Sequence, residues 1–162
     1  MRGIVIMLEQ NKVMQGILEL EKKIGRMIPL PQKILFATPG TLEKILSILV
    51  SSETEVKILK QDDFFDVIYR SVNIVQKQNS KVLVNAESKI FPHYLPDNAI
   101  KKIRDKKESI GDIIDSESME TFRRIHALGY NFSPKSFTKT YHIIHKQNIA
   151  FEIREVFMTE FC

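Results

Sequence analysis

Two stretches of the chain alternate between apolar and polar residues, and each has one charged residue on its apolar face. In residues 67–74, Arg70 has the same parity as Ile68, Val72 and Ile74. In residues 151–157, Glu155 has the same parity as Phe151, Ile153 and Phe157. Because successive side chains of a strand point to opposite faces, both charges are expected on a buried face. A buried charge requires a partner or a ligand, so Arg70 and Glu155 are the first candidates for functional residues.

Size and charge narrow the class of protein. The 162 residues, 43% of them hydrophobic, suit a single globular domain. A net charge of +4 fits a small anionic ligand and is too weak to indicate nucleic acid as a partner. No signal peptide or membrane span is recognisable, and the single cysteine, Cys162, cannot form an internal disulfide. We therefore expect a cytoplasmic protein that binds neither nucleic acid nor membranes.

Hydrophobic periodicity and turn residues predict the elements. Four helices are expected, over residues 11–26, 39–51, 97–106 and 117–128. Five strands are expected, over residues 54–60, 65–76, 80–91, 137–146 and 149–160. Polar turns at 76–80 and 145–148 indicate antiparallel hairpins. The order of elements favours an α+β fold with a single, mainly antiparallel β-sheet and helices on one face.

Three local features set the expected helix ends. The prolines Pro29 and Pro31 prevent the first helix from continuing. Thr38 before Pro39 is typical of an N-cap followed by the first helical position. Gly129 is expected at the C′ position after the helix over 117–128.

The sequence leaves two interpretations of Arg70 and Glu155 open. They could form a buried ion pair that only supports the structure. Alternatively, they could lie in a ligand cavity, where the planar fork of an arginine grips a carboxylate and the glutamate meets an oxygen at the other end of the ligand. Gly111, after Ile110, could let backbone N–H groups approach a ligand, although a plain turn is the simpler interpretation. The four histidines have no matching cysteine or carboxylate cluster, so no metal site is expected.

An ordered set of short motifs resembles the chorismate pyruvate-lyase family, and more closely its short prokaryotic branch. The resemblance begins near residue 33 and continues to the C-terminus. The motifs are Ala37-Thr38-Pro39-Gly40-Thr41-Leu42, Tyr69-Arg70-Ser71-Val72, Ala86-Glu87-Ser88 leading to Pro92, Ser109-Ile110-Gly111, Thr121-Phe122-Arg123-Arg124 and Arg154-Glu155-Val156-Phe157. The resemblance implies one domain over 1–162, with a chorismate lyase-like core over 33–162 and an N-terminal helical extension over 1–32.

The resemblance also implies roles for particular residues. The arginine matching Arg70 grips the ring carboxylate of the ligand, and the glutamate matching Glu155 hydrogen-bonds the oxygen at the opposite end. The backbone at Ile110, next to Gly111, helps to hold the carboxylate, and an apolar residue matching Leu42 packs on the ring. The chain departs from the family at Pro39, where an acidic residue is common, and at Glu43, where a threonine is common.

The implied reaction removes pyruvate from chorismate and leaves 4-hydroxybenzoate, without metal or organic cofactor. The implied partner is a small anionic aromatic or cyclohexadienyl carboxylate. A second hypothesis is a sensor domain of the same fold that binds such a ligand without turnover. We expect no DNA-binding domain, since only about thirty residues precede the core. A third hypothesis is a structural domain in which Arg70 and Glu155 merely pair.

Overall fold

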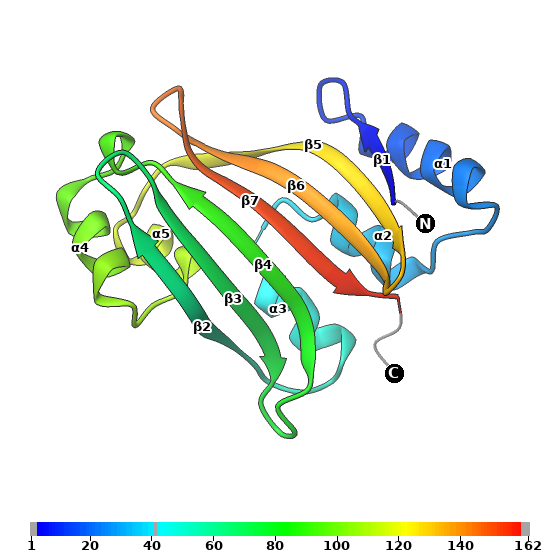
Figure 1. Ribbon diagram of the computed structural model, residues 1–162, viewed down its shortest axis with the longest axis horizontal. Coiled ribbons are helices and arrows are strands. Elements are labelled where there is room, and N and C mark those ends of the chain that lie inside the picture. The colour runs from blue at the N-terminus through cyan, green and yellow to red at the C-terminus, as the bar shows by residue number, and fades with distance from the viewer. Residues whose placement is uncertain (1–2, 41, 160–162) are drawn as a thin grey trace.

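The computed structural model describes residues 3–40 and 42–159. Its centre is one seven-stranded sheet in the order β1-β5-β6-β7-β4-β3-β2, with every neighbouring pair antiparallel (Figure 1). The strands are β1 (Ile4–Met7), β2 (Thr54–Asp63), β3 (Ile68–Gln76), β4 (Val82–Ile90), β5 (Thr121–Phe132), β6 (Lys135–His145) and β7 (Asn148–Met158). The α-helices are α1 (Val13–Ile24), α2 (Leu30–Ala37), α3 (Leu42–Leu49), α4 (Asp97–Asp105) and α5 (Ile110–Ser116).

The helices cover one face of the sheet, which we call the covered face. Figure 1 shows α2, α3 and α5 behind the sheet, α4 beside the β2 edge and α1 beside the β1 edge. Between these layers lies the hydrophobic core, in which Phe36 of α2 packs edge-on against Phe137 and Phe157, with ring centroids 5.6 and 5.2 Å away. The predicted α+β class, with one antiparallel sheet and helices on one face, is therefore confirmed.

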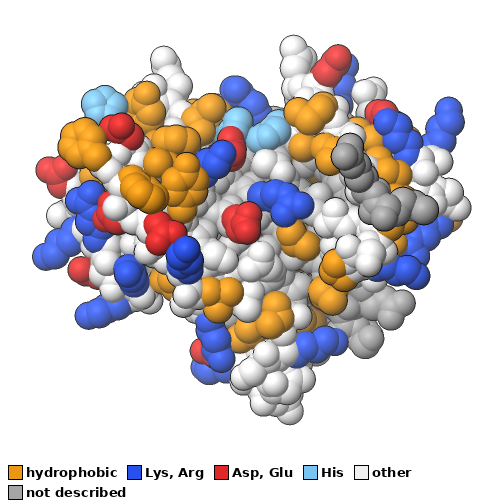
Figure 2. All heavy atoms as spheres, viewed as in Figure 1, with side chains coloured by type: hydrophobic (Ala, Val, Ile, Leu, Met, Phe, Trp, Pro, Cys, Tyr) orange, Lys and Arg blue, Asp and Glu red, His pale blue; other side chains and the backbone are white. Residues whose placement is uncertain are grey.

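The opposite, open face carries charged side chains of both signs, with apolar groups in several places between them (Figure 2). A groove on this face is lined partly by Lys89, Glu152 and Arg154. Glu152 already has cationic or polar partners there, at 3.2 Å from both Lys89 and His142. Glu152 of the open face therefore does not need a ligand as a partner.

The helix predicted over 117–128 is wrong, because residues 121–132 form strand β5 between β1 and β6. Arg123 and Ile125 lie toward the covered face, and Phe122 and Arg124 are exposed. Gly129 is accordingly not a helix terminator. A Cβ there would clash with the Thr138 hydroxyl and lie 2.8 Å from the Ile4 carbonyl, so the close approach of three strands requires glycine.

Two further details between the first helices differ from the prediction. The first helix ends at Ile24 because Gly25 adopts the left-handed conformation, with φ of 72°. The prolines then open an unpredicted helix, α2, since proline is tolerated in a first helical turn. Thr38 is the C-cap of α2, not an N-cap, and its hydroxyl donates to the Ile34 carbonyl at 2.6 Å. Helix α3 starts at Leu42, and Thr41 lies outside the described residues.

Both predicted hairpins are present, as β3–β4 and β6–β7. The N-terminal segment contains a strand as well as the expected helix, since Ile4–Met7 pairs with β5. The predicted end of the last strand, residue 160, and Cys162 fall outside the described residues. Among the described residues, no helix has the length and apolar character needed to cross a membrane.

Candidate ligand-binding site

A cavity of about 70 Å³ lies between the covered face of the sheet and helices α3 and α5. Its walls combine apolar side chains with a small number of charged ones, as ligand sites generally do. The lining residues are Leu42, Glu43, Val56, Arg70, Val72, Ile74, Ala86, Ser88, Ser109, Ile110, Gly111, Arg123, Tyr141, Ile143, Ile153 and Glu155. All five residues singled out from the sequence, namely Leu42, Arg70, Ile110, Gly111 and Glu155, therefore line one cavity.

Arg70 and Glu155 are both buried, at 2% and 4% exposure, as strand parity predicted. Strand β4 separates them: Arg70 is opposite Ser88, and Glu155 is opposite Ala86 two residues away. Ordinary strand spacings put their Cα atoms about 12 Å apart. None of the ion pairs among the described residues joins them. The interpretation as a mutually neutralising pair is therefore wrong.

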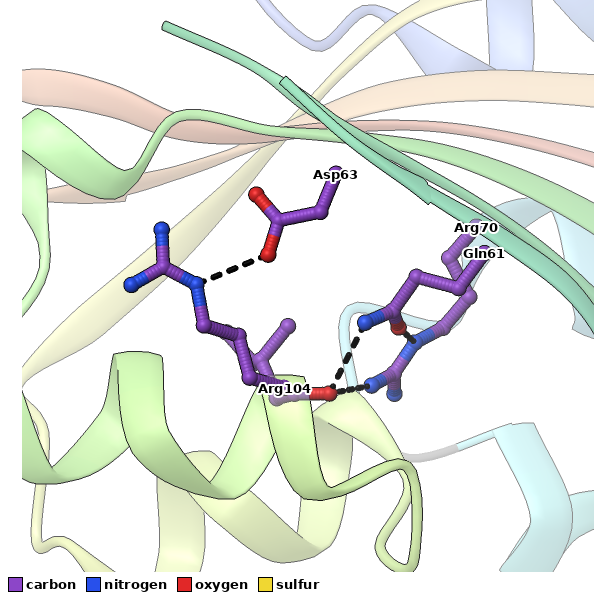
Figure 3. Close-up of polar contacts among 5 residues, drawn as sticks. Gln61, Asp63, Arg70 and Arg104 are labelled. Atoms are coloured by element: carbon purple, nitrogen blue, oxygen red, sulfur yellow. Dashed lines mark hydrogen bonds and ion pairs between the residues drawn. The ribbon is translucent and has the colours of Figure 1, made fainter. Parts of the chain in front are cut away.

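Neutral oxygens hold the Arg70 guanidinium in place (Figure 3). Its Nε donates to Gln61 Oε1 at 2.8 Å, its Nη2 to the Ile103 carbonyl at 2.7 Å and its Nη1 to the Glu108 carbonyl at 3.0 Å. The Ile103 carbonyl is at the C-terminal end of α4, where the helix dipole favours a cation. Of the five N–H groups of an arginine, one on each Nη has no partner among the described residues and can donate to a ligand.

Burial lowers the pKa of Arg70 to about 10, so the side chain remains charged at neutral pH. A fixed cation with two remaining donors, in a cavity with apolar walls, is suited to a planar carboxylate. The contact with α4 also means that Arg70 contributes to the structure independently of any ligand.

One oxygen of Glu155 is held and the other is available. Oε1 accepts the Tyr141 hydroxyl hydrogen at 2.7 Å, and Oε2 is buried with no partner among the described residues. An unsatisfied buried carboxylate oxygen costs about 1–3 kcal/mol or more, so its presence beside a cavity indicates a place for a donor. A ligand hydroxyl would provide that donor.

The helices supply the remaining walls. Leu42, 6% exposed, is the first residue of α3. Ile110 and Gly111 form the first turn of α5, after an N-cap at Ser109 whose hydroxyl accepts from the Asp112 amide at 3.1 Å. First-turn amides have no partner within their own helix, so those of Ile110 and Gly111 can donate to a ligand. The segment is thus the start of a helix and not a plain turn.

Three ionisable residues of the cavity and one behind it were given no role from the sequence: Glu43, Arg123, Tyr141 and Lys139. Lys139 could have been found by parity, because it alternates with Phe137, Tyr141 and Ile143 as Arg70 does with its neighbours. Parity does not identify Arg123, because the sequence predicts a helix for its segment and strand alternation does not apply to a helix.

Lys139 lies behind the cavity and is 2% exposed. Its Nζ donates to the carbonyls of Leu35 and Thr38, at 2.9 and 2.8 Å, and so holds the end of α2 against the sheet. Burial lowers its pKa, opposed by the nearby charge of Glu155. The ammonium is 5.2 Å from the centroid of the Tyr141 ring, and the guanidinium of Arg123 is 6.0 Å from it. Two cations therefore flank the tyrosine that holds Glu155.

No group of three or more histidine, cysteine, aspartate or glutamate residues suited to a metal occurs among the described residues. No protein-family profile matches the chain. A Methanocaldococcus jannaschii protein named Putative lyase MJ0807 is 32% identical to it, over an alignment that covers 83% of each chain. The chain belongs to this lyase-like family.

Proposed function

We propose that the protein is a lyase that eliminates pyruvate from chorismate to leave 4-hydroxybenzoate, or acts on a closely related cyclohexadienyl carboxylate. The observation that carries the proposal is the cavity between Arg70 and Glu155, two buried and opposite charges that do not pair with each other. The relationship to a protein named as a lyase supports the reaction class. The resemblance to chorismate pyruvate-lyases supports the substrate.

In this reaction the ring loses its enolpyruvyloxy group together with one hydrogen from the adjacent carbon, and becomes aromatic. The hydrogen ends on the released pyruvate, so the atoms balance without an oxidant, a reductant or water. Aromatisation supplies the driving force. The protein has to hold the reactive conformer and match the developing charge, which fixed groups in a dry cavity do effectively.

Each cavity residue then has a defined task. Arg70, with the first-turn amides of Ile110 and Gly111, would bind the ring carboxylate. Glu155 would accept a hydrogen bond from the ring hydroxyl through Oε2, while Tyr141 fixes its other oxygen. Leu42 would pack against the ring.

The test is incubation of the purified protein with chorismate. We expect pyruvate and 4-hydroxybenzoate to form in equal amounts, measured by a lactate dehydrogenase-coupled assay and by chromatography. Formation of neither product above spontaneous breakdown would exclude the chorismate lyase activity. Arg70→Ala should lose turnover, with circular dichroism as the check on its fold.

A sensor without turnover is the second candidate function. The observation that favours it is that protein hydrogen bonds already fix Arg70 and one oxygen of Glu155 in position. Binding of 4-hydroxybenzoate at micromolar concentration, with no product formed from chorismate, would support this function over the first.

A further inference from the structure

Arg123 is a charged residue of the cavity that has no role in the reaction proposed above. It lies on β5, and its Nη1 donates to the Pro39 carbonyl at 2.8 Å. Its Nε is buried and has no hydrogen-bond partner among the described residues. A buried N–H of a guanidinium without an acceptor is costly, so this atom indicates a place for an acceptor on the ligand.

Arg123 reaches the cavity from the side opposite Arg70. Strands β4, β7 and β6 separate β5 from β3, so the two arginines start four strand spacings apart, about 19 Å before sheet curvature and the inward reach of their side chains. Neither takes part in an ion pair among the described residues. Two cations on opposite walls match a ligand with two separated anionic groups.

The charges around the cavity agree with a dianion. Arg70, Arg123 and the nearby Lys139 are cationic, and Glu155 and Glu43 are the acidic groups. Burial raises the pKa of Glu43, and the neighbouring charges of Asp112 and Glu155 add to that effect, so ionisation of Glu43 is disfavoured there. With Asp112 included, three cations balance three carboxylates when all are ionised, and protonation of Glu43 makes the surroundings net positive.

We propose that Arg123 binds the second carboxylate of a dianionic substrate, so that the site selects cyclic dicarboxylates over monocarboxylates. This inference rests on the proposed function, in which Arg70 holds the ring carboxylate. In an elimination that releases pyruvate, the second carboxylate belongs to the group that leaves. Arg123 would then hold the leaving fragment while Arg70 and Glu155 hold the ring.

Calorimetric titration with two stable probes tests this assignment. The first is 4-hydroxybenzoate, and the second is its 3-carboxymethoxy derivative, which adds an ether-linked carboxylate beside the hydroxyl. The variants are Arg123→Gln, Arg123→Lys and the control Arg124→Gln. Arg124 is the adjacent arginine, exposed on the other side of the same strand, so the control makes the same change of charge away from the cavity.

We expect wild type to bind the derivative more tightly than 4-hydroxybenzoate. Arg123→Gln should bind the derivative about tenfold or more weakly than wild type, because a hydrogen bond to a charged group is lost. Its affinity for 4-hydroxybenzoate should fall by less than about threefold. Arg123→Lys should recover part of the loss, and Arg124→Gln should match wild type. If Arg123→Gln does not fold, Arg123→Lys provides the test. A smaller ratio of the two affinities in Arg123→Lys than in wild type would support the assignment, and an unchanged ratio would overturn it.

Equal weakening of both probes, no weakening of either, or a wild type that prefers 4-hydroxybenzoate would overturn the assignment. A wild type that binds neither probe would overturn it as well. The readout is binding, so a protein that shows the expected selectivity but releases no pyruvate from chorismate refutes the lyase and leaves the assignment of Arg123 intact.

Discussion

Tyr141 donates its hydroxyl hydrogen to Glu155 Oε1 at 2.7 Å, and both residues are buried on the covered face of the sheet. The bond joins adjacent strands diagonally, since Tyr141 is directly opposite Ile153, two residues before Glu155. It fixes one carboxylate oxygen and leaves Oε2 as the acceptor for a ligand. Tyr141 is therefore a positioning residue for Glu155.

Tyr141→Phe should weaken both folding and ligand binding. With the hydroxyl removed, both oxygens of a buried carboxylate lack a partner, which should lower the free energy of unfolding by about 1–3 kcal/mol. Urea unfolding at pH 7 measures this change, and titration with 4-hydroxybenzoate measures the loss of affinity. Tyr69→Phe is the matched control, because Tyr69 is 43% exposed on β3 and should tolerate the change. Equal stability of the two variants would contradict the role of Tyr141.

Alkaline pH should narrow the difference in stability between wild type and Tyr141→Phe. Burial, followed by the charge and hydrogen bond of Glu155, raises the pKa of Tyr141 well above its ordinary value of 10.0. A tyrosine whose pKa is raised in the folded state contributes stability that is fully present below about pH 10. This contribution is lost as the pH rises beyond that value. Urea midpoints at pH 8 and pH 10.5 check this, and a constant difference between the two proteins would contradict it.

Gln61 should affect ligand binding without lying among the cavity-lining residues. It accepts from Arg70 Nε at 2.8 Å and donates to the Ile103 carbonyl at 3.1 Å, so it orients the guanidinium. We expect Gln61→Leu to lower the affinity for 4-hydroxybenzoate about threefold to tenfold, since one hydrogen bond to a charged group is lost. Calorimetric titration is the measurement.

Arg104 provides the control for this prediction because it joins the same two elements at the surface. Its Nε donates to Asp63 at 2.8 Å, with the two side chains 49% and 36% exposed (Figure 3). Surface ion pairs of this kind contribute about 0–1 kcal/mol, so Arg104→Gln should leave ligand affinity unchanged. Comparable losses in Gln61→Leu and Arg104→Gln would show that any disturbance between β2 and α4 has the same effect.

Glu43→Gln should stabilise the protein at pH 7. Burial raises the pKa of Glu43 in the folded state, so its ionised form is disfavoured there and stability falls as pH rises through the folded pKa. The variant should have the higher urea midpoint at pH 7, and the difference should disappear near pH 4, where the carboxyl group is protonated. Glu87→Gln, at an exposed position on β4, should show no such trend. A urea midpoint at pH 7 that is lower for Glu43→Gln than for wild type would contradict this prediction.

Helices α3 and α5 should move when a ring enters. The cavity of about 70 Å³ is smaller than the roughly 150 Å³ that accommodates benzene in an engineered cavity of another protein. These helices form the wall of the cavity that can move outward, because the strands of the opposite wall are paired with neighbours on both sides. Hydrogen exchange should show marginal protection of the α3 and α5 amides without ligand and stronger protection with 4-hydroxybenzoate. Equal protection in both states would indicate a rigid wall.

Strand parity predicted the burial of Arg70 and Glu155 because it depends only on the alternation of side chains, which holds wherever strands form. It could not show whether the two would pair, since that depends on the strand order, and β4 lies between them. The same argument would have identified Lys139. It does not identify Arg123, because the local pattern of that segment predicts a helix.

The segment that contains Arg123 shows where local pattern fails. Met119, Phe122 and Ile125 recur at helical spacing, and a glycine follows at 129, so a helix was a reasonable expectation. The structure instead places the segment between β1 and β6, and pairing with two strands outweighs a weak helical preference. Only the tertiary arrangement reveals that Gly129 serves close strand approach and not helix termination.

A crystal structure of the protein with 4-hydroxybenzoate tests most directly whether Arg70 and Glu155 hold one ligand between them. We predict the carboxylate within hydrogen-bond distance of the Arg70 Nη atoms and the hydroxyl within hydrogen-bond distance of Glu155 Oε2. A ligand bound on the open face, or a cavity that stays closed at saturating ligand with Arg70 and Glu155 unchanged, would contradict the assignment of this site.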